Sequence, residues 1–171
     1  MQIREERPED AEGIRAVNDA AFGGEDESAL VDRLRDDDLM VVSLIAEEYG
    51  EIVAHIAFSE LEVTSNDHKR SIRAAALAPM AVAPTHQRLG IGSELVRQGL
   101  DKCREYGIEA VLVVGHERFY PRFGFSAEIA ECLKSPFSGP FSMVLPLKHG
   151  VFDDFRGFVI YPDAFGIEID K

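Results

Sequence analysis

The chain has 171 residues, of which 46% are hydrophobic, and a formal net charge of −13. This length suits a single globular domain whose core needs no disulfide or metal support. The acidic balance disfavours nucleic acid as a partner, because affinity for a phosphate backbone depends on basic clusters that displace counterions. The two cysteines, Cys103 and Cys132, have no C-x-x-C or histidine-rich neighbourhood, so we expect no metal site.

No stretch approaches the ~20 apolar residues that a membrane span requires. The N-terminus, MQIREERPED, is too charged for a signal peptide. We therefore expect no membrane partner and a cytoplasmic location.

The N-terminal part of the chain predicts a strand, two amphipathic helices and an antiparallel hairpin. Pro8-Glu9-Asp10 places proline and acids where a helix begins, and Gly23-Gly24 ends that helix. The other predicted ranges are 2–6 for the strand, 27–35 for the second helix, and 40–47 with 51–64 for the hairpin.

A strand, a loop and a helix are predicted between Ser71 and Tyr106. The strand ends at Pro84, and Pro79 within it cannot donate to a ladder, so the strand must bulge or splay there. The helix begins near Ile91, because apolar residues then recur at spacings of three to five with charged residues between them.

The loop before this helix has the features of an anion site. Gly90 and Gly92 permit a tight turn and a close approach to the backbone. The free amides and the positive dipole of the helix start attract a phosphate, and Arg88 adds a charge, whereas Glu94 opposes it. The spacing fits neither a P-loop nor a dinucleotide fingerprint. Taken alone, the two glycines are equally consistent with an ordinary strand-to-helix turn.

A second block follows the helix. A short strand over 110–115 precedes the aromatic segment His116 to Phe125, HERFYPRFGF, which predicts a short helix beginning at Tyr120 and ended by Gly124. After it we expect a strand from Phe125, a loop over 132–140, a strand over 141–147, a strand-like stretch over 155–161 and a turn at 162–163.

The two blocks, in this order and separation, resemble the GNAT superfamily of N-acetyltransferases. In that superfamily a Q/R-x-x-G-x-G/A loop binds the pyrophosphate of acetyl-coenzyme A, and a later Y-x-x-x-G-F segment carries a tyrosine near its sulfur. Gln87 to Gly92 and Tyr120 to Phe125 match these motifs. The resemblance implies an α/β (α+β) fold with a central mixed, largely antiparallel sheet, a splayed cofactor strand and flanking helices.

The resemblance also implies where acetyl-CoA binds. Backbone groups of Met80, Ala81 and Val82 would pair with the pantetheine arm as an added strand would. The remaining residues implied in cofactor binding are Gln87, Arg88, Leu89, Gly90, Ile91, Gly92, Ser93, Tyr120 and Phe123. The helix-start acids Glu25, Asp26 and Glu27 would border the acceptor pocket, or form only a solvated helix start.

Tyr120 is the expected general acid. A phenol with a pKa of about 10 can protonate a thiolate with a pKa near 8.5; the alternative is that its ring only packs among the neighbouring phenylalanines. The identity of the general base stays open, because residues 74–83 contain no ionisable side chain. The alternatives are a water relay or one of four side chains, namely His55, Glu60, His116 and Glu117.

The sequence thus predicts an acetyl-CoA-dependent N-acetyltransferase without a metal. Its acceptor would be a primary amine of a small molecule or a protein. Transfer of a longer acyl group and assembly into a homodimer are further possibilities. The alternative is a non-catalytic acyl-CoA binding or sensing module, since the strand lacks a carboxylate. We expect one domain over 1–147 and a C-terminal extension over 148–171, which resembles the tail of a bacterial-type subfamily whose acceptor is unassigned.

Overall fold

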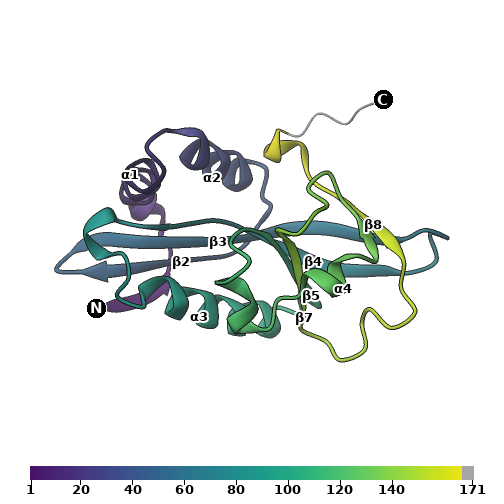
Figure 1. Cartoon of the computed structure of the whole chain (residues 1–171). Coiled ribbons are helices and arrows are strands. Elements are labelled where there is room, and N and C mark those ends of the chain that lie inside the picture. The colour runs from purple at the N-terminus through teal and green to yellow at the C-terminus, as the bar shows by residue number, and fades with distance from the viewer. Residues whose placement is uncertain (167–171) are drawn as a thin grey trace. The chain divides into compact units, whose positions relative to one another are not determined.

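The computed structural model describes residues 1–166 (Figure 1). Its α-helices are α1 (Ala11–Phe22), α2 (Asp26–Asp36), α3 (Ile91–Glu105) and α4 (Ala127–Ala130). Its strands are β1 (Gln2–Glu5), β2 (Met40–Glu48), β3 (Glu51–Ser65), β4 (Ser71–Val82), β5 (Ala110–Val114), β6 (Leu133–Lys134), β7 (Ser142–Pro146) and β8 (Gly157–Ile160). Short 3-10 turns cover Pro8–Asp10, Pro84–His86, Tyr120–Phe123 and Asp163–Phe165.

The eight strands form one sheet, in which six strands follow the order β1-β2-β3-β4-β5-β7. Strand β8 pairs with β3, and β6 pairs with β8. The pairs β1–β2, β2–β3, β3–β8 and β5–β7 are antiparallel, whereas β4–β5 and β6–β8 are parallel. The prediction of a mixed, largely antiparallel sheet with helices is therefore confirmed.

The chain divides into two compact units, which we describe separately. The first comprises Met1–Ser59 and Leu77–Cys103, and the second comprises Glu60–Ala76 and Arg104–Lys171. Residues 148–166 of the predicted extension lie in the second unit and supply β8, whereas 167–171 fall outside the described residues. The boundary at residue 147 stays a prediction. Within 1–166, no helix is long and apolar enough to cross a membrane.

In the first unit the sheet is covered on both faces. Every β3 residue from Val53 to Ser59 is buried, as expected for a strand with helices on either side. On one face, Ile14 of α1 and Val31 of α2 pack with Ile45 of β2. On the other face α3 approaches so closely that a Cβ on Gly99 would lie 2.7 Å from Cζ of Phe58. Figure 1 shows α1 and α2 on the opposite side of β2 and β3 from α3.

Gly99→Ala is expected to destabilise the protein, although alanine is the better helix former by about 1 kcal/mol. The added methyl group would overlap the Phe58 ring, and overpacking of a core costs about 1–3 kcal/mol. Urea unfolding should show a net loss of stability, and adding Phe58→Leu should recover part of it. A Gly99→Ala protein as stable as the wild type would contradict this packing.

The second unit has its own apolar core on the other half of β3 and β4. Leu61, Ala74, Leu112, Val144 and Phe155 are among its buried members, which come from β3, β4, β5, β7 and the segment before β8. The extension therefore contributes to this core as well as to the sheet.

Two elements differ in type from the sequence prediction. The strand expected from Phe125 is instead the short helix α4, because Ser126 caps it by accepting a hydrogen bond from the backbone N–H of Ile129 at 3.1 Å. A single bridge from Ser126 to Val144 is the pairing recorded there. Within the expected loop over 132–140, β6 forms, because β8 provides Leu133 and Lys134 with partners.

Candidate active site

The loop before α3 turns through the left-handed region at Gly90, one of the two predicted glycines, whereas Gly92 lies within α3. Arg88 and Gly90 both have positive φ, at 65° and 85°, in the left-handed region that favours glycine. All four residues of 87–90 are exposed, and no atom lies within 4 Å of the position of a Cβ on Gly90. The outer side of this turn is open to a ligand.

The start of α3 presents amides without a helical acceptor. The first helical hydrogen bond runs from the Glu94 N–H to the Gly90 carbonyl at 3.1 Å, so the amides of Ile91, Gly92 and Ser93 have no acceptor within the helix. Glu94, whose charge opposes an anion, accepts a hydrogen bond from Gln98 at 3.0 Å and pairs with Arg97 at 3.7 Å. Both partners lie further along the helix and partly neutralise that carboxylate.

The loop is tied to the end of β4. Gln87 donates from Nε2 to the Val82 carbonyl at 3.1 Å, and the site of a Cβ on Gly92 lies 3.5 Å from Met80 Cε and 3.7 Å from Val82 Cγ2. The loop before α3 and the end of β4 are therefore in direct contact. The Val82 carbonyl, which we expected to be free for a cofactor arm, already accepts one hydrogen bond.

The turn over Pro84–His86 is anchored to β2. His86 contacts Glu48 through Nε2 at 2.9 Å and Thr85 Oγ1 through Nδ1 at 2.8 Å. These contacts fix the course of the chain between β4 and the loop.

The first unit thus brings together most of the predicted cofactor residues. Met80 and Val82 are half-buried, whereas Ala81 is 1% exposed. Pro79, preceded by a cis peptide, lies within β4 and can donate no ladder hydrogen bond. Parallel pairing with β5 is recorded for 74–76. The splay beyond these residues stays a prediction.

Tyr120 lies in the second unit at the start of the 3-10 turn Tyr120–Phe123. Its ring packs edge-on against Phe119 at 5.0 Å and Phe125 at 5.6 Å between centroids. A Cβ on Gly115 would lie 2.5 Å from its Cε2, so the absent side chain makes room for the ring. Burial leaves Tyr120 8% exposed and raises its pKa to about 12. The phenol is therefore protonated throughout the physiological range.

Phe123 closes the same turn. Its ring contacts Phe119 at 5.2 Å, and the Arg122 guanidinium lies 4.7 Å over the Phe119 ring. Gly124 follows with φ of 100°, which is the conformation that the sequence predicts for the residue ending the turn. The aromatic cluster holds Tyr120 by packing.

Three of the candidate bases are accessible in the second unit. Glu60 is 41% exposed and pairs with Arg73 at 3.3 Å, and His116 and Glu117 are exposed in the turn before Tyr120. In the first unit, Glu25 and Asp26 are exposed at the start of α2. Their role towards an acceptor stays a prediction.

His55 is a structural residue. It is completely buried, with Nδ1 at 3.1 Å from Asn18 Nδ2 and Nε2 at 2.9 Å from Ser43 Oγ. Since an amide N–H can only donate, Nδ1 accepts and Nε2 carries the proton to Ser43. Burial, reinforced by the charge of Arg35, lowers the His55 pKa to about 3. Both ring nitrogens are occupied in a site closed to water, which removes His55 from the candidate bases.

The neutral His55 is expected to make the fold acid-sensitive. Its pKa is lower in the folded than in the unfolded state, so its contribution is complete above pH ~6.5 and is lost as the pH falls towards 3. At pH 5 this loss amounts to about 2 kcal/mol. Urea unfolding at pH 7.5 and 5 should show a smaller pH dependence in His55→Gln than in the wild type. Equal pH dependence in both proteins would contradict the neutral assignment.

Gly115 is a position that the sequence did not single out. Its importance follows from the Tyr120 ring, which occupies the space of its missing side chain. Glycine occurs at strand ends for many reasons, so the sequence around Gly115 does not predict its contact with the Tyr120 ring.

Comparison with known proteins agrees with these features. The family model of the acetyltransferase (GNAT) domain matches residues 2–127. The chain is 32% identical over 168 residues to the uncharacterized N-acetyltransferase YhbS of Escherichia coli K12, covering 96% of this chain and 98% of that protein. It is 39% identical over 118 residues to the E. coli K12 N-acetyltransferase YjhQ, covering 68% and 64%.

Two solved structures are similar over almost the whole chain. The CoA complex of E. coli YhbS has a TM-score of 0.88 and 30% identity, covering 97% of this chain and 92% of that one. The acetyl-CoA complex of a GNAT family acetyltransferase from Brucella melitensis has a TM-score of 0.77 and 34% identity, covering 96% and 97%. The chain is a member of the GNAT family of acetyltransferases.

Proposed function

We propose that the protein transfers an acetyl group from acetyl-CoA to a primary amine of a small molecule or protein. The observation that carries the proposal is the α3 start, where an exposed loop, three amides without a helical acceptor and Arg88 meet the end of β4. Such a terminus suits the pyrophosphate of a coenzyme A compound. Two relatives of the same family were crystallised with CoA and acetyl-CoA.

The residues of the first unit would hold the donor. The amides of Ile91, Gly92 and Ser93 would bind the pyrophosphate, with Arg88 adding an exposed charge and Gly90 giving access. Backbone groups of Met80, Ala81 and Val82 would take the amide groups of the pantetheine arm, in the way that an extended peptide adds to a strand. Gln87 fixes the loop to Val82, whereas Leu89 is exposed beside it.

Tyr120 would act at the leaving sulfur. Acetyl-CoA supplies an acetyl group on a thioester; the amine nitrogen bonds to the carbonyl carbon, the carbon–sulfur bond breaks, and the Tyr120 hydroxyl gives its proton to the sulfur. The products are the acetylated amine and free CoA thiol. Tyr120 suits this step because burial keeps it protonated, and Phe123 steadies the same turn.

The amine must lose its proton before it attacks. An alkyl ammonium with a pKa of about 10.4 is only ~0.04% neutral at pH 7, so a base or a water path has to remove the proton. Glu60, His116 and Glu117, all accessible in the unit that contains Tyr120, would be the candidate side chains for this role, with a water relay as the alternative.

A thermal-shift titration tests the donor assignment. Acetyl-CoA and CoA are expected to stabilise the protein, whereas ATP at equal concentration should not; a ligand at ~100 times its dissociation constant adds about 2.7 kcal/mol. Thiol release should then identify the amine. If neither coenzyme A compound stabilises the protein at millimolar concentration, the donor site is not the one proposed.

A further inference from the structure

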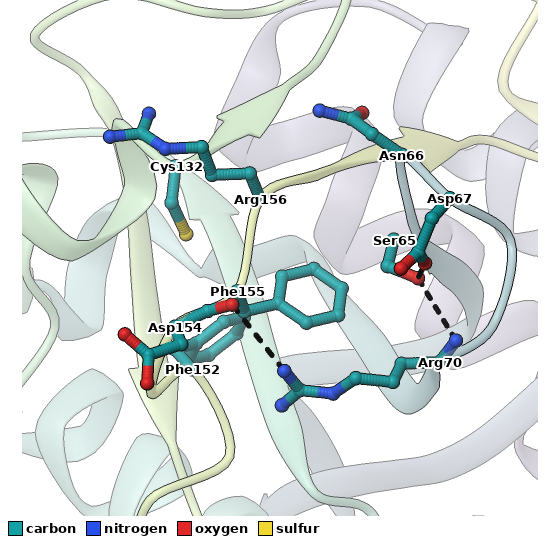
Figure 2. A pocket seen from close by; sticks show the side chains of 9 residues that line it. All are labelled: Ser65, Asn66, Asp67, Arg70, Cys132, Phe152, Asp154, Phe155 and Arg156. Carbon is teal, nitrogen blue, oxygen red and sulfur yellow. Dashed lines mark hydrogen bonds between the residues drawn. The ribbon is translucent and has the colours of Figure 1, made fainter.

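A pocket of about 580 Å³ lies in the second unit, between the β3–β4 turn and the segment before β8. This size is within the range of small-molecule sites, ~300–1,000 Å³. Its walls carry polar and charged groups together with two phenylalanines (Figure 2). The lining residues are Ser65, Asn66, Asp67, Arg70, Cys132, Phe152, Asp154, Phe155 and Arg156.

Two of the charged side chains already make contacts within the protein. Arg70 donates to the carbonyls of Asp153 at 3.3 Å and Val151 at 3.5 Å and stacks 5.1 Å over the Phe155 ring. Asp67 accepts from Ser65 Oγ at 2.6 Å and the Lys69 amide at 3.0 Å. These contacts hold the walls together, and because the partners of Arg70 are neutral, its charge still contributes to the pocket.

Arg156 is different. Its guanidinium has no ion pair or hydrogen bond recorded among residues 1–166, although its main chain is fixed by the Asn66 amide, which donates to its carbonyl at 2.9 Å. Figure 2 shows the Arg156 side chain extended away from the Phe155 ring, and the Asp154 carboxylate is also directed away from that ring. Within the described part of the chain, Arg156 is therefore a cation without a recorded partner that lines the pocket from a backbone held by Asn66.

The other side of the pocket is apolar. Phe152 and Phe155 pack edge-to-face at 6.0 Å between centroids; Phe155 is 3% exposed, so the half-buried Phe152 offers most of the accessible apolar surface. The Cys132 thiol lies beside them and is partly accessible. An apolar body resting on these groups would be removed from water, which is favourable in proportion to the area buried.

We propose that this pocket binds a small carboxylate with an apolar, aromatic-sized body, the carboxylate pairing with Arg156 and the body packing on the half-buried Phe152. A carboxylate is the partner that matches the planar donors of a guanidinium in two parallel hydrogen bonds. This ligand site is additional to the acetyl-transfer site and needs no covalent step.

Alkylation of Cys132 in the full chain measures occupancy directly. Cys103 is completely buried, so iodoacetamide under native, mildly alkaline conditions should label Cys132, as peptide mass spectrometry can verify. The probe is phenylacetate. At about four times its dissociation constant it should slow labelling about fivefold, because mass action leaves about one pocket in five free.

Matched probes and variants decide the outcome. Acetate, which lacks the apolar body, and 2-phenylethylamine, which replaces the carboxylate with a cation, should protect much less. Arg156→Gln should abolish protection by phenylacetate, whereas Arg118→Gln, the same change at an exposed arginine outside the pocket, should keep it. Equal protection by the amine or by acetate, or protection that survives Arg156→Gln, would overturn the proposal. No protection at ~10 mM phenylacetate would also overturn it, because a dissociation constant well above ~10 mM does not amount to a specific site.

Discussion

Tyr120→Phe is expected to lower kcat by a factor of about 10²–10⁴, the usual contribution of a positioned general acid. The variant keeps the ring that packs against Phe119 and Phe125 and fills the space beside Gly115. The fold and the affinity for acetyl-CoA should therefore change little. Steady-state thiol release with a responsive amine gives kcat, and calorimetry gives the donor affinity.

The pH profile distinguishes proton donation from a packing role. With a pKa of about 12, Tyr120 stays protonated well into the alkaline range, so the wild-type kcat should show no descending limb from this group below pH ~11. Burial disfavours a thiolate as it does a phenolate, so it raises the pKa of the CoA thiol as well. In the same surroundings the leaving sulfur is therefore a better proton acceptor. Tyr49→Phe, at a 98% exposed tyrosine, serves as the control and should leave kcat unchanged. An unchanged kcat in Tyr120→Phe would remove the acid assignment.

The elements that the sequence predicted well are those set by local chemistry. Apolar spacing placed α3, whose structure begins at Ile91, because a helix that buries one face repeats every 3.6 residues. Gly23 and Gly124 end their helical segments with positive φ, as their identity implied. Local sequence also placed the exposed loop over 87–90, since a backbone that must adopt left-handed angles favours glycine.

The features that the sequence did not predict depend on contacts between distant residues. β6 forms because β8 pairs with it, and no pattern in the two residues Leu133 and Lys134 indicates a strand. Ser126 favours a helix cap over the strand that the following apolar residues suggested. His55 was a candidate base by type, but Asn18 and Ser43 from other elements make it structural.

Gly92→Asp is expected to weaken acetyl-CoA binding about 30- to 1000-fold, a loss of about 2–4 kcal/mol. A carboxylate at this position would stand within a few ångström of the bound pyrophosphate, and like charges about 4 Å apart repel by ~1 kcal/mol in water and ~4 kcal/mol near a protein surface. Calorimetric titration with acetyl-CoA measures the loss. Raising the ionic strength should reduce it, because salt screens exposed charges.

Two further substitutions at Gly92 separate charge from size. Gly92→Ala should bind acetyl-CoA nearly as well as the wild type, because its Cβ would rest at an ordinary 3.5 Å from Met80 Cε, and Gly92→Asn adds the bulk of aspartate without its charge. The aspartate variant should also fold well, since an acid in the first turn of a helix is stabilising by about 0.3–1 kcal/mol. If a folded Gly92→Asp protein loses affinity for acetyl-CoA while Gly92→Asn retains most of that affinity, the anion binds at the α3 start. Undiminished affinity in Gly92→Asp would instead place the pyrophosphate elsewhere.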